Sequence, residues 1–159
     1  MSKTKRAVLT RLGLITAAGA LAAAPALAAT TTTISTGTVK RGTVVVSKSG
    51  LTLYAFSKDS SKKSVCTGSC ASAWVPWMAN GTVTVKSGSG LSQNLVGTIT
   101  RSGTQKQITY GGHPLYHYVG DKNAGQSNGQ AQKQFGGYWY VVSKSGSLLK
   151  PSSGLVGGY

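Results

Sequence analysis

One seven-residue pattern occurs twice in the chain and limits the folds available to it. Residues 53–59 read Leu-Tyr-x-aromatic-x-x-Asp, and residues 115–121 read the same, 62 positions later. The final residues of the two copies, Asp59 and Asp121, are the only acidic residues among 159. Self-similarity of this kind indicates a repeat architecture in which each repeat is one supersecondary unit. Because both acids fall at the same repeat position, we expect that each repeat specifically requires a carboxylate there.

The segments around the two motifs have the composition of short strands. β-Branched and aromatic residues fill six runs punctuated by Gly and Ser, at 43–46, 51–56, 82–85, 107–110, 115–118 and 138–142. Turn signals able to close hairpins lie between them, at 47–50, 111–112 and 143–146. We therefore predict an all-β fold: a single small domain of two related hairpin repeats, about 44–80 and 107–149, with one short helix around 71–74 near the cysteines.

The first 28 residues have the features of a secretory signal peptide. A basic start precedes an apolar run at 12–24 and small residues at the cleavage position. This run is shorter than the ~20 residues that a permanent membrane helix needs. We expect residues 1–28 to be removed, 29–38 to form a flexible Thr-rich leader and 39–159 to fold, with no transmembrane segment remaining. No Cys follows the signal, so no lipid anchor is expected on this secreted, periplasmic or cell-envelope protein.

The charge balance restricts the class of partner. The chain has 17 Lys and Arg and a net charge of +15, yet charged residues make up only 12% of it. An ordinary soluble domain has roughly 25%, so acids are depleted rather than bases enriched. The bases are largely scattered, which argues against specific nucleic-acid recognition, and two carboxylates are too few for calcium loops or two-metal sites. An anionic envelope polymer or a glycan is the partner that this charge favours.

The repeated motif also carries a resemblance to a known family. Residues 54–59 and 116–121 each read Tyr-x4-Asp, and the chain resembles the bacterial "secreted repeat of unknown function" family, whose exported members, often lipoproteins, carry tandem copies of this motif. Residues 66–74 and 125–129 look like the family as well. Because the family has no assigned biochemical activity, the resemblance implies an exported repeat protein and names no reaction.

Each motif Asp is expected to organise the loop that follows its strand. Asp side chains accept hydrogen bonds from backbone N–H groups of turns, and both Asp59 and Asp121 precede loop-like sequence. We expect the Tyr five residues earlier, Tyr54 or Tyr116, to pack beneath it, with Arg101 as the bidentate partner. The alternative is that Tyr54, Asp59, Tyr116 and Asp121 form a binding site at the surface.

The two cysteines allow two interpretations. Cys66 and Cys70 are the only cysteines, and in an exported protein a disulfide between them is the expected state. The alternative joins both thiols with His113 and His117 as zinc or copper ligands of a metal-handling or redox protein. On a regular strand these two His would lie about 13 Å apart, so their spacing does not establish a chelate.

The sequence offers few residues that could form a catalytic site. An acid and a base need different environments, whereas the only two carboxylates occupy equivalent repeat positions. The aromatic residues of the strands are expected to form core, and the alternative is a surface platform for glycans. The leading interpretation is a secreted, non-enzymatic binding or structural module of the cell envelope, without a cofactor.

Overall fold

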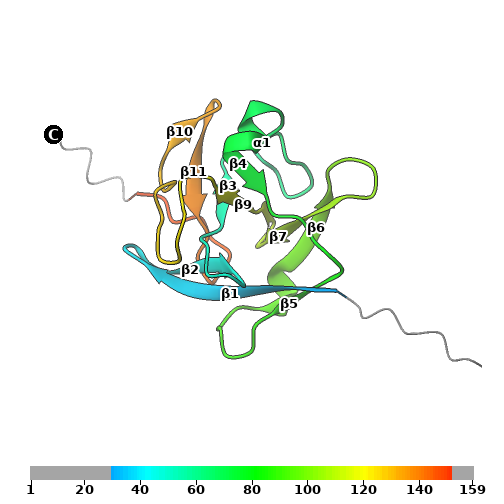
Figure 1. Cartoon of the computed structure of the whole chain (residues 1–159), viewed down its shortest axis with the longest axis vertical. Helices are drawn as coiled ribbons and strands as arrows, with labels where there is room; N and C mark the ends of the chain where they lie inside the picture. Colours follow the sequence, from blue (N-terminus) through cyan, green and yellow to red (C-terminus); the bar gives the residue numbers. More distant parts are fainter. Residues whose placement is uncertain (1–29, 152–159) are drawn as a thin grey trace, which may run out of the picture.

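The computed structural model describes residues 30–151, which form eleven strands, one α-helix and one 3-10 helix (Figure 1). The strands are β1 (Thr31–Val39), β2 (Gly42–Ser47), β3 (Tyr54–Phe56), β4 (Trp74–Pro76), β5 (Thr82–Val85), β6 (Val96–Thr100), β7 (Lys106–Tyr110), β8 (His113–Pro114), β9 (Tyr116–Tyr118), β10 (Lys133–Gln134) and β11 (Gly137–Val141). The helices are α1 (Ser69–Ala73), beside the cysteines, and η1 (Gln93–Leu95). The predicted all-β class is confirmed. The predicted signal peptide lies outside the described residues.

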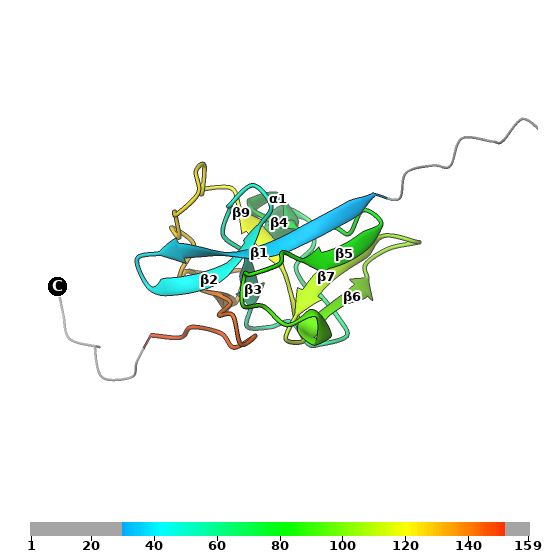
Figure 2. The same ribbon diagram turned by 90° about the horizontal axis from the view of Figure 1, so that it is seen from below.

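The strands form three sheets. A central sheet has the order β10-β11-β3-β9-β4, and two smaller sheets have the orders β2-β1-β5 and β6-β7-β8. Figure 2 shows the long strand β1 running beside β2 in one part and beside β5 in the other. The hairpin β1–β2 precedes β3, and the hairpin β6–β7 precedes β8 and β9 in the same way. Each repeat therefore begins with a hairpin and continues into the central sheet.

The two repeats exchange their last strands in the central sheet. Its middle strands, β3 and β9, are antiparallel and meet at Tyr54 and Tyr116, the same position of the two motifs. On the outer sides, β11 of the second repeat pairs with β3 of the first, and β4 of the first pairs with β9 of the second. This order is that of two units related by an approximate two-fold axis between β3 and β9.

Backbone hydrogen bonds continue the exchange beyond the sheet. The Val45 amide donates to the Val142 carbonyl at 2.8 Å, and the Ile108 amide donates to the Trp77 carbonyl at 2.9 Å. In both cases a residue of one repeat's hairpin binds the segment that follows the other repeat's last strand. The repeats are thus complementary halves of one domain and share their backbone pairing.

The Thr-rich segment differs from the prediction, because most of it is strand β1 and not a flexible leader. Residues 31–39 pair antiparallel with β2 and parallel with β5, and Ile34 within them is fully buried. Thr is β-branched and favours strands even where no apolar alternation is present. The folded domain therefore begins before residue 39, and the first repeat includes a strand that the composition concealed.

The core lies on both faces of the central sheet. Successive side chains of a strand point to opposite faces, so Tyr54 and Phe56 enter one cluster while Leu53 and Ala55 enter the other. The first cluster contains five buried aromatic side chains, and the second is mainly aliphatic. Since both faces are covered, the motif residues of β3 are held by packing from two sides.

Candidate functional site

The motif Tyr and Asp residues form two reciprocal pairs between the repeats. Tyr54 Oη donates to Asp121 Oδ2 at 2.5 Å, and Tyr116 Oη donates to Asp59 Oδ2 at 2.5 Å. The antiparallel meeting of Tyr54 and Tyr116 directs each phenol across the axis toward the other repeat. The expected packing of each Tyr beneath the Asp of its own motif is therefore replaced by a crossed arrangement.

The second carboxylate oxygen of each Asp closes the loop that follows its motif. Asp59 Oδ1 accepts the Val65 amide at 2.8 Å, and Asp121 Oδ1 accepts the Asn128 amide at 2.9 Å. Each carboxylate thus joins its own loop to the phenol of the other repeat. Two such contacts per carboxylate account for why Asp is used at both positions, since its two oxygens accept at once.

Burial sets the protonation of these pairs. Desolvation, and then the hydrogen bond to the carboxylate, raise the pKa of Tyr54 and of Tyr116 well above the usual value, so both phenols stay protonated donors. Desolvation also raises the pKa of Asp59 above 3.8, against the opposing hydrogen bonds from Tyr116 and Val65. The arrangement holds charge inside the fold and presents neither phenol as a free nucleophile.

A stack of four aromatic rings lies beside the pairs. Ring centroids are 4.4 Å apart for Phe56 and Trp139, 3.9 Å for Trp139 and Trp74, and 4.3 Å for Trp74 and Tyr118. Phe56 and Tyr118 occupy equivalent motif positions, so the stack follows the two-fold relation. Phe56, Trp74 and Trp139 are buried and Tyr118 is half-buried, so the rings of this stack belong to the core and do not form an open platform, whereas Tyr138 of β11 is exposed.

Arg101 reaches the Tyr116–Asp59 pair through the hydroxyl of Ser64 and is not the predicted bidentate partner of an Asp. Its guanidinium donates to Ser64 Oγ at 2.6 Å, to the Cys66 carbonyl at 2.6 Å and to Gln107 Oε1 at 2.8 Å. Ser64 Oγ is in turn 2.6 Å from Tyr116 Oη. The guanidinium fork is therefore filled by neutral acceptors, and its charge reaches Asp59 only at a distance.

The cysteines form the expected disulfide and are not metal ligands. Cys66 and Cys70 are bonded with their Cα atoms 5.2 Å apart. His113 and His117 line two different surface hollows. Among residues 30–151 no three His, Cys, Asp or Glu side chains come together as a metal site, so the alternative set of Cys66, Cys70, His113 and His117 is not assembled.

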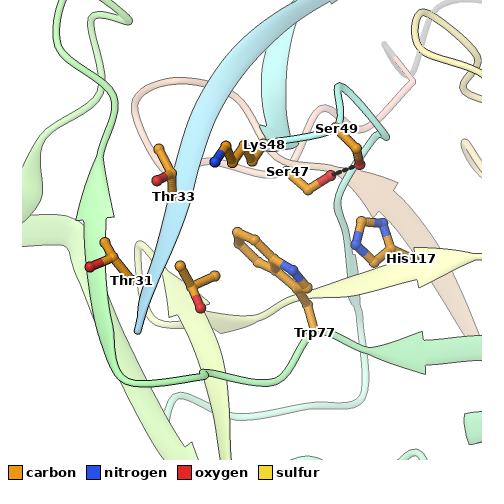
Figure 3. Close-up of a pocket in the computed structure, with 8 residues that line it drawn as sticks. Thr31, Thr33, Ser47, Lys48, Ser49, Trp77 and His117 are labelled. Carbon is orange, nitrogen blue, oxygen red and sulfur yellow. Dashed lines mark hydrogen bonds between the residues drawn. The ribbon is translucent and has the colours of Figure 1, made fainter. Parts of the chain in front are cut away.

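A surface hollow that the sequence did not predict as a site lies against β1. It measures about 560 Å³ and is lined by Thr31, Thr32, Thr33, Ser47, Lys48, Ser49, Trp77 and His117 (Figure 3). The indole of Trp77 and the imidazole of His117 lie on one side, with ring centroids 6.0 Å apart. In the view of Figure 3, Lys48, Ser47 and Ser49 lie above these two rings, and Thr31 and Thr33 lie on strand β1 beside them. We call this the β1 hollow.

The electrostatics of the β1 hollow are simple. Desolvation lowers the pKa of His117 below 6.5, so the imidazole is neutral at neutral pH. Lys48 is then the cation among the lining residues, and the remaining polar groups are hydroxyls. A second hollow of about 440 Å³ adjoins it, since Thr33, Ser47 and Lys48 line both, and it adds Lys86. The two hollows together offer aromatic, hydroxyl and cationic contacts.

Sequence reasoning missed the β1 hollow because its walls come from four separate segments. Thr31–Thr33 were expected to be part of a flexible leader, and His117 was considered as a metal ligand. The one available signal was the turn 47–50, whose sequence Ser-Lys-Ser-Gly recurs at 143–146. The two copies have the same sequence, so the sequence does not show that the copy at 47–50 borders the β1 hollow.

These features define a disulfide-bearing all-β protein made of two interlocked repeats with crossed Tyr–Asp pairs. The sequence model of a family described as a secreted repeat of unknown function matches residues 35–78 and 97–143, more than half of the chain. The chain belongs to this family. Both matches begin inside the first hairpin strands, β1 and β6, so the repeats start earlier than the predicted 44 and 107.

No curated protein and no solved structure matches the chain. The family description makes it a secreted repeat, and the disulfide fits an extracellular location. Among the described residues, no helix has the length and apolar character needed to cross a bilayer.

Proposed function

We propose that this protein is a non-enzymatic module of the cell envelope that binds an anionic glycan or envelope polymer in the β1 hollow. The observation that carries the proposal is the convergence of an indole, several hydroxyls and one ammonium group in a single open hollow. Ligand sites typically combine an apolar or aromatic wall with a few placed polar groups. The lining of the β1 hollow has this composition.

The chemistry of each wall suits an acidic sugar. The half-buried Trp77 offers a flat apolar surface for the C–H face of a sugar ring, and the Thr and Ser hydroxyls can both donate to and accept from sugar hydroxyls. Lys48 supplies a charged donor for a carboxylate or phosphate, and such charge-assisted bonds are the stronger kind. The adjoining hollow with Lys86 provides room for the next unit of a polymer.

The surface charge supports an anionic partner. Asp59 and Asp121 are the only acidic side chains of the chain, and each is engaged by a Tyr phenol and a backbone amide. Neither lines the β1 hollow. Because the carboxylates are held in this way, the Lys and Arg side chains dominate the field outside and attract polyanions.

The proposal of a non-enzymatic role rests on the same hydrogen bonds of Asp59 and Asp121. A glycosidase needs one free acid and one free base, and both carboxylates here serve the fold. The sequence of residues 125–129, Gly-Gln-Ser-Asn-Gly, matches the Gly-x-Ser-x-Gly pattern of a nucleophile elbow. A nucleophile elbow, however, is a sharp turn from a strand into a helix. This segment lies in the loop between β9 and β10, where Asp121 binds Asn128.

The test compares two lysines in the same local sequence. Lys48 and Lys144 occupy equal places in two Ser-Lys-Ser-Gly turns, each with a hydroxyl contact between its two Ser, at 2.9 and 2.8 Å. Only Lys48 lines the β1 hollow. We expect Lys48→Gln to weaken binding of polygalacturonate about three- to tenfold, roughly 1 kcal/mol, and Lys144→Gln to change it less than about twofold.

The binding can be measured by isothermal titration calorimetry or affinity electrophoresis, with a neutral glucan as the second ligand. Lys48→Arg should recover most of the affinity, because it keeps the charge. Equal losses in Lys48→Gln and Lys144→Gln would show that only overall charge matters and would refute the assignment to the hollow. Absence of any preference for the acidic polymer over the neutral one would refute the ligand class.

A further inference from the structure

The turn between β10 and β11 holds an aromatic residue in a conformation that aromatic residues seldom adopt. Gln134 pairs with Gly137, so Phe135 and Gly136 form a two-residue hairpin loop. Both have positive φ, 53° for Phe135 and 79° for Gly136. Loops of this kind favour Asn-Gly, since a left-handed conformation is costly for residues with a bulky Cβ substituent. Phe135 is therefore not the residue that the turn itself selects.

Packing does not offset this cost. The Phe135 side chain is 47% exposed and belongs to neither core cluster of the described domain. A strained position that the surrounding contacts do not explain is a reason to look for a function there. The chain keeps a large apolar ring at the tip of a hairpin, where it meets solvent.

The residues around the tip are aromatic and cationic. Tyr138 is 42% exposed, stacks on Tyr140 with centroids 6.0 Å apart, and has Lys133 Nζ 5.8 Å from its ring centre. Gly137 lies against the stem of Lys58, since a Cβ added there would meet Lys58 Cγ at 2.8 Å. Both Asp of the chain are engaged elsewhere, so within residues 30–151 no side-chain carboxylate opposes these two lysines.

The tip is remote from the β1 hollow. In Figure 1 the β10–β11 hairpin rises at one end of the molecule, and β1 crosses the opposite end. The hairpin is also held firmly, because the Ser57 amide donates to the Tyr138 carbonyl at 2.9 Å and Ser57 Oγ accepts the Tyr138 amide at 2.8 Å. A rigid support of this kind presents Phe135 in a fixed direction.

From these observations we infer that the β10–β11 tip docks on a bilayer surface with anionic headgroups, with Phe135 inserted and Lys133 and Lys58 on the phosphates. Aromatic rings partition to the boundary between headgroups and acyl chains, and nearby lysines gain attraction to anionic lipids. Docking at this end leaves the β1 side facing away from the bilayer. The inference is independent of the proposed glycan site.

A bilayer fits the tip better than a glycan does. A sugar polymer stacks on a flat or concave aromatic surface, whereas Phe135 projects from a two-residue turn and is convex. A convex apolar group with flanking cations suits a deformable surface that it can enter. If the tip bound a glycan instead, Phe135→Gly would lose polygalacturonate binding.

The experiment uses the protein recovered from the culture medium and large vesicles of phosphatidylglycerol and phosphatidylcholine, with pure phosphatidylcholine as reference. Phe135→Gly removes the ring and relieves the backbone, so we expect an equal or higher melting temperature and a partition coefficient lower by on the order of tenfold. Ala131→Gly is the matched control, because Ala131 also has positive φ, 60°, and carries no aromatic ring. It should leave vesicle binding unchanged.

Two further variants test the insertion of residue 135 and the independence of this site from the β1 hollow. Phe135→Trp should keep binding, and its added emission should shift to shorter wavelength on anionic vesicles only. Lys48→Gln should not alter vesicle binding, which separates this inference from the glycan proposal. The inference is overturned if Phe135→Gly binds vesicles as the parent does, if the parent shows no preference for anionic vesicles, or if Phe135→Gly loses polygalacturonate binding instead.

Discussion

The crossed Tyr–Asp pairs predict an energetic coupling between the repeats that can be measured directly. Tyr54→Phe removes the donor that Asp121 Oδ2 accepts at 2.5 Å and leaves a carboxylate only 7% exposed with its remaining amide contact to Asn128. Asp121→Asn removes the charge from the same bond. A hydrogen bond to a charged group contributes about 1.5–3 kcal/mol, and a buried group left without its partner costs at least as much. We therefore expect each single change to cost about 2 kcal/mol and the pair to show a coupling energy of about 1–3 kcal/mol.

The assay is urea unfolding followed by the fluorescence of Trp74 and Trp139, which are fully buried beside the pair. The matched control is the cycle of Tyr54→Phe with Asp59→Asn, two residues of the same motif whose partners lie in the other repeat. Its coupling should stay within about 0.5 kcal/mol, as for independent sites. A Tyr54–Asp121 coupling below that value, or an equally large Tyr54–Asp59 coupling, would refute the crossed arrangement.

Two further predictions concern acid and close packing. Burial lowers the pKa of His113 and His117 below 6.5, so the unfolded chain binds protons first and stability should fall as the pH drops from 7 toward 5. The raised pKa of Asp59 has the opposite sign and adds stability as the pH falls toward 3.8, so urea titrations that show complete unfolding by pH 4 would contradict this account. Gly129→Ala should cost about 1–3 kcal/mol, because a Cβ there would lie 2.6 Å from Trp74 Cη2; an unchanged urea midpoint would show that the ring can move aside.

Local composition sufficed to predict most of the strands. Runs such as 43–46, 82–85 and 138–142 consist of β-branched and aromatic residues between Gly and Ser, and the structure has strands at all three. These signals are local, because β-branched and aromatic side chains suit a pleated surface wherever it lies. The disulfide was predictable for a similar reason, since only one pairing of two cysteines exists.

Strand β1 was missed because its signal lies in its partners. A run of Thr has no apolar period, and Ile34 is the only apolar residue of the strand before Val39. What fixes the segment is pairing with β2 on one side and with β5, some fifty residues later, on the other. Pairing over that separation leaves no trace in the local composition.

The residues of the candidate sites could be found from the local sequence only in part, because their contacts depend on segments that are far apart in the chain. The repeated motif identified Tyr54, Asp59, Tyr116 and Asp121 as a group, but which Tyr meets which Asp depends on the antiparallel contact of β3 with β9. The β1 hollow needed four segments in place at once. The Phe135 turn needed a φ value, which a Phe in a loop does not reveal.

The exchange of last strands sets an order of events during synthesis. One neighbour of β3 is β11, which ends at Val141, so the first repeat has an open sheet edge until nearly the whole chain has emerged. Until then Tyr54 has no acceptor, and Trp74 lacks the ring of Trp139. We expect the nascent chain to stay unfolded for most of its length, which is the state that passage through a narrow export channel requires. Folding would then begin only on the far side, where the cysteines can also oxidise.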